Sequence, residues 1–279
     1  MWMHNGNIGA WKYVKRPLAD SLSDKWFLDV KGGTDSEWAF ALFLDTLERE
    51  EGVDPSSEPD GGFDTKTLRR AMKKTIAKIN AFVKAVPAEH HLADVETRSL
   101  LNFAVTDGHS VIVTRYVSSK TDAAASLYYS SGTAWVEGKT KGQFRMERRD
   151  KASDVVLVAS EPLTFERHNW LSVPTNTIVT ICNQTVYVRP IKDEYYDPDP
   201  STERSTGFAR SKGLVAKVPG GGTATPTTVV GTPVPRTEVE ASDGSFIAKE
   251  DLDTYSSKMA DLHLQTGTAL NRGSDQLVI

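Results

Sequence analysis

The chain has 279 residues, of which 39% are hydrophobic and 25% charged, with a net charge of −4. This composition supports one substantial hydrophobic core and excludes the strongly basic surface that nucleic acids or anionic membranes attract. The single cysteine, Cys182, excludes an intrachain disulfide and is typical of a reducing, cytoplasmic environment. The first residues lack the features of a signal peptide, and no run approaches the roughly 20 apolar residues of a membrane span.

The first half of the chain carries the signals of two helices. Thr34 and Glu37 have the spacing of a capping box, in which Thr34 caps a helix and Glu37 reaches back to it. The apolar residues that follow recur at helical spacing and predict a helix over 35–50. After a loop over 51–62, apolar residues recur every three or four positions, and this pattern predicts a second, amphipathic helix over 68–86.

From about residue 98 the pattern changes to short runs rich in β-branched and aromatic residues, which predict strands. Asp107-Gly108 is the clearest hairpin signal in the chain, and Ser131-Gly132 predicts another turn. Helices followed by strands indicate an α+β domain. The predicted strands cover residues 101–105, 110–117, 125–129, 154–159, 177–181 and 185–188.

The composition shifts after Tyr196 to a stretch rich in proline, glycine and threonine. Such a stretch buries too little apolar surface to offset the entropy lost on ordering. We therefore expect one domain over 1–196 and a flexible, mostly disordered tail over 197–279, with one short helix near 249–264.

Two short motifs near the beginning of the chain suggest chemistry. Asn5-Gly6 is a strong turn signal, and its side-chain amide and backbone N–H are two neutral donors suited to an oxyanion. Asp35, in the first turn of the predicted helix, suits the α-ammonium group of an amino acid, and the helix dipole favours its charge. Each motif alone is also an ordinary structural signal, and only their combination is specific. No metal site and no cofactor are expected.

These motifs belong to an ordered series over about residues 1–196 that resembles the class II glutamine amidotransferases, which are N-terminal-nucleophile hydrolases. The series is similar to one branch in particular, the fungal amidotransferase-like subunits of an alternative glutathione-degradation pathway. Bacterial relatives of that branch include a γ-glutamyl hydrolase of ergothioneine synthesis. The segments that carry the resemblance are Trp2–Gly6, Thr34–Leu44, Asn102–Gly108, Thr114–Tyr116, Ala159–Leu163, Trp170–Pro174 and Asp193–Tyr196.

The resemblance implies an αββα sandwich and hydrolysis of a γ-glutamyl amide bond in glutathione or a related compound, beside a metallopeptidase-like partner subunit. It implies that Asn5 and Gly6 form the oxyanion hole and that Asp35 binds the substrate α-amino group. The family nucleophile is a cysteine at the processed N-terminus, whereas this chain begins with Met1 and Trp2. We therefore expect a truncated domain that lacks its first strands, its nucleophile and the carboxylate-binding arginine, and that is inactive as it stands.

Two alternatives remain open at this point. The first alternative to a γ-glutamyl hydrolase is a non-catalytic scaffold or regulatory subunit that binds a peptidase partner. The second is a glutaminase subunit that delivers ammonia to a separate synthase. Neither nucleic acid nor a membrane is an expected partner.

Overall fold

The structure is a computed structural model that describes residues 1–86, 95–132, 134–138, 144–147, 155–164, 169–199, 202–216, 238–240 and 246–248. The chain divides into two compact units. The first comprises Met1–Tyr129, Ala159–Pro162 and Leu171–Val215, and the second comprises Ser130–Val158, Leu163–Trp170 and Ala216–Ile279. The helix predicted near 249–264 lies outside the described residues.

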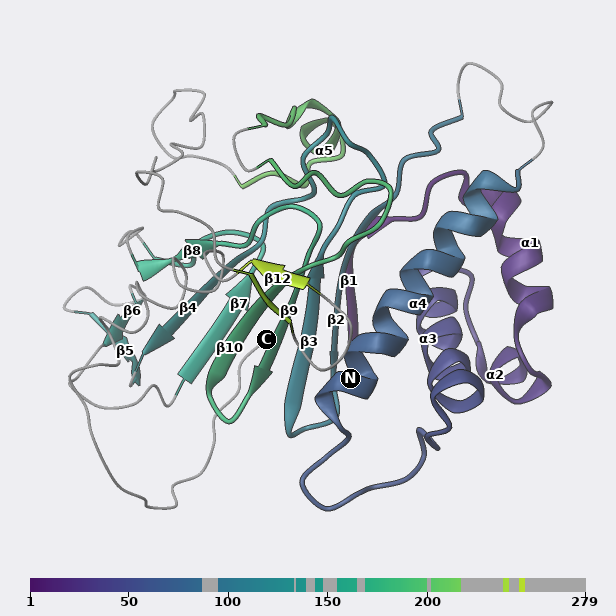
Figure 1. The fold of residues 1–279 in the computed structure, drawn as a ribbon, viewed down its shortest axis with the longest axis horizontal. Coiled ribbons are helices and arrows are strands. Elements are labelled where there is room, and N and C mark those ends of the chain that lie inside the picture. Colours follow the sequence, from purple (N-terminus) through teal and green to yellow (C-terminus); the bar gives the residue numbers. More distant parts are fainter. Residues whose placement is uncertain are drawn as a thin grey trace. The chain divides into compact units, whose positions relative to one another are not determined.

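An antiparallel five-stranded sheet forms the centre of the first unit (Figure 1). Its strands, in spatial order, are β1 (Trp2–Asn7), β2 (Leu100–Thr106), β3 (Ser110–Arg115), β9 (Thr177–Cys182) and β10 (Thr185–Pro190). The last four match predicted runs. The predicted hairpin is also confirmed, because β2 pairs with β3 and the Asp107 carboxylate accepts from the backbone N–H groups of His109 and Ser110.

The predicted turn at Asn5-Gly6 is wrong, because both residues lie inside β1. Asn5 is opposite Asn102 and Gly6 is opposite Leu101 in the antiparallel ladder with β2. The Trp2 ring packs on Phe103 with centroids 4.7 Å apart. This tertiary burial and the backbone pairing override the local turn preference of an Asn-Gly pair.

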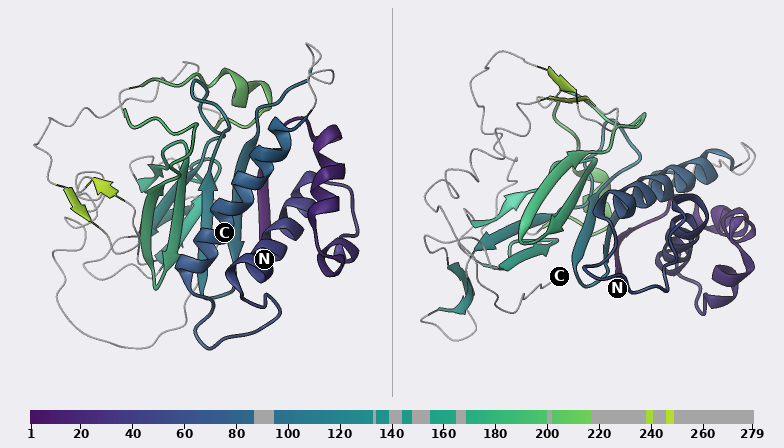
Figure 2. Two further views of the ribbon diagram at one scale, coloured as in Figure 1. Left: turned by 45° about the vertical axis from the view of Figure 1, so that its right-hand side comes forward. Right: turned by 60° about the horizontal axis from the view of Figure 1, so that its bottom comes forward.

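Two long helices cover one face of this sheet, as Figure 2 shows, and confirm the two predicted helices. They are α3 (Asp35–Glu51), which ends at Gly52 in the left-handed conformation, and α4 (Thr65–Lys84), which Asp64 caps by accepting from Thr67 N–H. The core between them and the sheet includes the fully buried Phe43, Met72 and Phe103. Burial of each such side chain contributes roughly 1.5–3 kcal/mol.

Two shorter helices precede α3 and were not expected from the sequence. They are α1 (Trp11–Ser21) and α2 (Asp24–Asp29). Helix α1 begins after Ala10, which is in the left-handed conformation and offers no capping side chain, so a local start signal is missing. It also contains Pro17, which disfavours a helix at that position. Val14 and Leu18 are fully buried in the main core, and this packing stabilises α1.

Smaller sheets account for the remaining strands. Tyr128 and Tyr129 of β4 (Tyr128–Gly132) pair with β8 (Leu171–Ser172), and β4 continues into the second unit, where β7 (Val155–Ala159) adjoins it. Also in the second unit, β5 (Ala134–Glu137) pairs with β6 (Phe144–Glu147), and β11 (Glu238–Glu240) with β12 (Phe246–Ala248).

The turn predicted at Ser131-Gly132 is therefore wrong, because these residues form the end of strand β4. A β-carbon on Gly132 would lie 2.4 Å from the Met146 side chain and 2.5 Å from the Glu147 carbonyl oxygen. The glycine accordingly permits a close approach inside the second unit and does not mark a chain reversal.

The first unit continues beyond residue 196, where the sequence predicted the beginning of the flexible tail. Helix α5 (Gly207–Ser211) buries Phe208 and Ala209 against Leu100 and Val117. Ser126 N–H donates to the Leu214 carbonyl at 3.0 Å. This part of the predicted tail is ordered because it carries two apolar residues that complete a small core. None of the helices in the described part of the chain combines the length and the apolar sequence that a membrane span requires.

Candidate functional site

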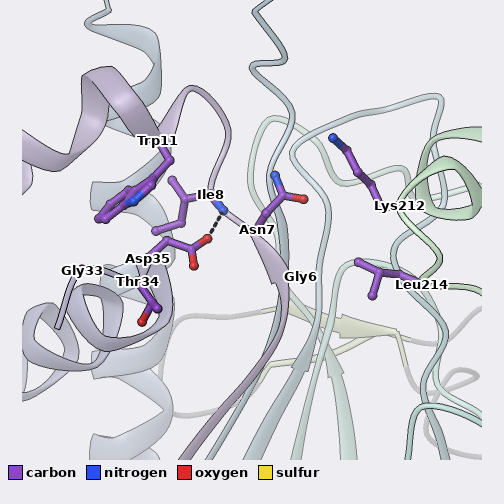
Figure 3. A pocket seen from close by; sticks show the side chains of 9 residues that line it. All are labelled: Gly6, Asn7, Ile8, Trp11, Gly33, Thr34, Asp35, Lys212 and Leu214. Carbon is purple, nitrogen blue, oxygen red and sulfur yellow. Dashed lines mark hydrogen bonds between the residues drawn. The ribbon is translucent and has the colours of Figure 1, made fainter.

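A cleft of about 640 Å³ opens in the first unit at the carboxyl end of β1 (Figure 3). Three segments form it: the end of β1 with the start of α1, the loop before α3 with its first residue, and the chain after α5. The cleft combines one carboxylate, one ammonium group, one amide and several apolar walls. Its lining residues are Gly6, Asn7, Ile8, Trp11, Gly33, Thr34, Asp35, Lys212 and Leu214.

Asp35 is held at the cleft by two backbone donors. Its Oδ2 accepts from Ile8 N–H at 2.8 Å, and its Oδ1 accepts from Ser36 N–H at 2.9 Å. Figure 3 shows the first of these bonds, which ties α3 to the end of β1. A carboxylate offers about four lone-pair sites, so two remain for a ligand. The half-buried Asp35 therefore remains a competent acceptor for an ammonium group.

Gly6 lies in the cleft wall, where the two strands approach too closely for any side chain. A β-carbon at this position would lie 1.8 Å from the Leu100 carbonyl oxygen and 2.9 Å from Nε2 of His4. The glycine is thus required by strand packing, independently of any role toward a ligand. The structure brings Gly6 and Asp35 to the same cleft, as the sequence motifs suggested.

Asn5 is half-buried and precedes the lining residues Gly6 and Asn7 on the same strand. Strand alternation places the Asn5 and Asn7 side chains on the face opposite His4. Within the part of the chain that the structure describes, the Asn5 amide makes no side-chain hydrogen bond, so its donors are available. The sequence motifs did not single out Asn7, although its amide lines the cleft.

His4 links the two elements that carry Gly6 and Asp35. Its Nε2 lies 3.0 Å from the Leu100 carbonyl oxygen and its Nδ1 lies 2.9 Å from Ser36 Oγ. Because a carbonyl only accepts, Nε2 carries the proton, and the neutral ring accepts from the Ser36 hydroxyl. Burial lowers the pKa of His4, and the Leu100 carbonyl and the Asp35 charge oppose this shift only in part. His4 is therefore a neutral positioning residue and not a cleft-lining group.

The rim of the cleft is fixed by a cap that differs from the predicted one. Thr34 Oγ1 accepts from Glu37 N–H at 3.4 Å, as a capping residue does. The Glu37 carboxylate, however, does not return to Thr34 but accepts from Lys31 N–H at 2.8 Å and Gly32 N–H at 2.9 Å. These bonds hold the loop before α3 against the helix, because Glu37 satisfies loop donors in preference to the helix cap.

Lys212 and Leu214 come from the segment that the sequence assigned to a flexible tail, so sequence reasoning missed them as site residues. The ordering signal was the apolar pair Phe208-Ala209, which is buried in α5. Only the tertiary structure shows that this short helix carries a lysine to a cleft formed by the first 35 residues.

Cys182 lies at the opposite end of the sheet from the cleft. It pairs with Ser110 and Thr185, whereas the cleft end of the sheet contains Asn7 and its partner Leu100. β2 and β3 also separate its strand from β1. Cys182 therefore cannot attack a ligand bound at Gly6. Among the described residues, no group of three or more His, Cys, Asp or Glu side chains is placed to hold a metal ion.

The chain belongs to the class II glutamine amidotransferase family, as a 50% identical relative shows, and its antiparallel α+β domain carries the His-Asn-Gly and Thr-Asp-Ser-Glu segments that resemble that family. The relative that carries this assignment comes from Saccharomyces cerevisiae and is described as "Probable glutamine amidotransferase DUG3". It is 50% identical over 218 residues, which cover 78% of this chain and 59% of the yeast protein. The chain thus spans about three fifths of that relative's length.

No protein-family model matches the chain. One similar solved structure is a glutamine aminotransferase class-II domain protein from Silicibacter pomeroyi, with 22% identity and a TM-score of 0.43 over 68% of this chain and 66% of that chain. Another is the glutamine phosphoribosylpyrophosphate amidotransferase of B. subtilis, with 13% identity and a TM-score of 0.36 over 68% of this chain and 29% of that one. The family assignment rests on the yeast relative and not on these structures.

Proposed function

We propose that this domain binds the γ-glutamyl end of a small molecule, and that the chemistry of its site is hydrolysis of a γ-glutamyl amide bond, in glutathione or a related compound. The observation that carries this proposal is that Asp35, with two free acceptor sites, shares one cleft with Gly6. A carboxylate fixed by backbone donors is suited to an α-ammonium group, because no side chain has to reorganise when the ligand binds.

The oxyanion donors in this proposal are the Asn5 amide and the Gly6 N–H. The Asn5 amide is not used by any described residue, and an oxyanion hole needs donors that are oriented before the reaction begins. The attacking thiolate is not supplied by Cys182, which lies at the far end of the sheet. The proposal is therefore that this chain, by itself, binds the γ-glutamyl group without releasing glutamate.

Calorimetric titration with reduced glutathione and an assay of glutamate release test this proposal together. The wild-type chain should bind glutathione, should release no glutamate, and should lose roughly 10-fold or more in affinity on Asp35→Ala substitution. Asp20→Ala, at an exposed position in α1, is the matched control and should leave binding unchanged. Equal affinity of Asp35→Ala and wild type would refute the assignment of Asp35, and glutamate release by the chain alone would refute the proposal that it binds without hydrolysing.

A partner subunit is the second part of the proposal, with a metallopeptidase-like chain as the candidate. The observation that favours a partner is that, among the strands that the structure describes, β1 lies at the edge of the five-stranded sheet and carries Met3, which is 45% exposed. An edge strand with an exposed apolar side chain is a surface on which another strand can add. Co-purification with a metallopeptidase homologue from the same organism, lost on Met3→Lys substitution, is expected. Co-purification with an ammonia-using synthase would instead indicate a glutaminase subunit.

A further inference from the structure

Leu214 forms an apolar wall of the cleft on the side away from Asp35. Figure 3 shows Gly6 between the Asp35 carboxylate on one side and the Leu214 side chain on the other, and all three residues line the same cleft. Leu214 is half-buried, so part of its side chain remains open to a ligand. The order of groups across the cleft is therefore a carboxylate, the backbone of β1 and an apolar side chain.

The other large apolar side chains of the cleft lie on the Asp35 side. Figure 3 shows Ile8 and Trp11 next to the Asp35 carboxylate. Ile8 is only 2% exposed and belongs to the main core, so it offers almost no surface to a ligand. Among the described lining residues, Leu214 is thus the apolar side chain that a ligand meets on the far side of Gly6.

The position of Leu214 is fixed through its backbone. Leu214 N–H donates to the Ala209 carbonyl at 2.9 Å, and the Leu214 carbonyl accepts from Ser126 N–H at 3.0 Å. Ala209 and its neighbour Phe208 are buried in α5, and the Arg98 guanidinium lies 4.0 Å from the centroid of the Phe208 ring. An apolar wall that is already in place contacts a ligand at little cost in conformational entropy.

The cleft is also larger than glutamine alone requires. Its volume of about 640 Å³ falls in the range of pockets that hold drug-sized ligands, and free glutamine is much smaller than these. A ligand with its α-ammonium at Asp35 and its γ-carbonyl at Gly6 continues past Gly6 with the group that its amide nitrogen carries. In this cleft, the continuation leads to Leu214 (Figure 3).

We propose that Leu214 contacts the amine part of the γ-glutamyl amide, so that the cleft favours amides whose nitrogen carries an apolar or aminoacyl group over free glutamine. The inference rests on the proposed function, because it takes Asp35 and Gly6 as the sites of the glutamyl part. Glutathione belongs to this class of ligand, since its cysteinyl side chain behaves as a small apolar group. The segment after α5 is then a determinant of specificity, which is a difference between two affinities.

Calorimetry on the full chain with two ligands tests the proposal. The ligands are L-glutamine and γ-L-glutamylbutylamide, which differ only in an uncharged alkyl group on the amide nitrogen. The wild type should bind the butylamide roughly 10-fold more tightly, because its alkyl carbons are partly buried against Leu214. Leu214→Ala should lower this preference about 3-fold or more by weakening butylamide binding, whereas Leu214→Met, which retains the volume, should keep it.

Val215→Ala is the matched control. Val215 packs against the same small core as Leu214, with Phe208 at its centre, but it does not line the cleft. Its substitution removes a similar apolar contact from the same segment, so it should leave the preference for the butylamide at its wild-type value.

The outcomes separate this inference from the proposed function. If Asp35→Ala weakens L-glutamine binding but the wild type binds the butylamide no more tightly than L-glutamine, the assignment of Leu214 is overturned and the proposed function stands. An unchanged preference in Leu214→Ala also overturns it, and so does an equal loss in Val215→Ala, because the loss then reports on packing of the segment. If the wild-type chain binds neither ligand, both proposals are overturned.

Discussion

Substitution of Gly6 by alanine should destabilise the fold through the contact between β1 and β2. The added β-carbon would lie 1.8 Å from the Leu100 carbonyl oxygen, whereas ordinary contacts begin near 3.4 Å. The two strands must therefore separate locally by roughly 1.5 Å, because neither backbone can rotate out of the way. A shift of this size breaks two or three ladder hydrogen bonds at about 1 kcal/mol each, so we expect a loss of roughly 2–4 kcal/mol in the free energy of unfolding.

Urea unfolding followed by circular dichroism measures this loss. Gly33→Ala is the matched control, because a β-carbon there would meet only Lys15 Nζ, at 3.5 Å. That variant should remain within about 0.5 kcal/mol of the wild type. If Gly6→Ala were as stable as Gly33→Ala, the register of β1 on β2 in this structure would be wrong.

Three further predictions concern buried polar groups. Tyr116→Phe removes the hydroxyl that donates to Asp193 Oδ2 at 2.5 Å. The free energy of unfolding, measured by heat or urea, should fall by roughly 1–3 kcal/mol. An unchanged free energy of unfolding would show that this bond is absent in solution. His4 has a lowered pKa, so its contribution to stability is complete above its unfolded value of 6.5 and is lost as pH falls below it. The stability of the wild type should therefore fall more steeply than that of His4→Asn between pH 6.5 and 5, and parallel curves would contradict a buried neutral ring. Burial acts to raise the pKa of Asp45, but hydrogen bonds from Arg49 and from the backbone of Ser23 outweigh it and lower the pKa. Asp45→Asn should lower the free energy of unfolding by about 1–3 kcal/mol at pH 7. This difference from the wild type should shrink as pH falls through the acidic range below 3.8, because the carboxylate is then protonated. Urea unfolding at several pH values measures the trend.

The regular elements with strong periodic patterns were predictable from the sequence. The two long helices, the Asp107 hairpin and most strands of the main sheet follow from apolar spacing and turn residues alone. Helix α1 was not predictable, because Pro17 and the uncapped Ala10 are both local signals against a helix. Its stability comes from burying Val14 and Leu18, which only the tertiary structure reveals.

The candidate site was predictable in part for a similar reason. Gly6 and Asp35 stand out because their residue types suit an oxyanion and an ammonium group, and the structure places both at one cleft. Asn5-Gly6 was nevertheless misinterpreted as a turn, because pairing of an edge strand with a partner 95 residues away leaves no local trace. Lys212 has no sequence signal at all, since its place at the cleft depends on where α5 packs.

The central claim is that the carboxyl end of β1 and the start of α3 form a site for a γ-glutamyl group. Nuclear magnetic resonance of the isotope-labelled chain, titrated with L-glutamine, tests it most directly. The backbone N–H signals of Gly6, Ile8 and Ser36 and the side-chain amide of Asn5 should shift in a saturable way, while the Asn183 signals beside Cys182 should not move. Unchanged signals at Gly6 and Ile8 with L-glutamine in excess, or shifts confined to the far end of the sheet, would contradict the account.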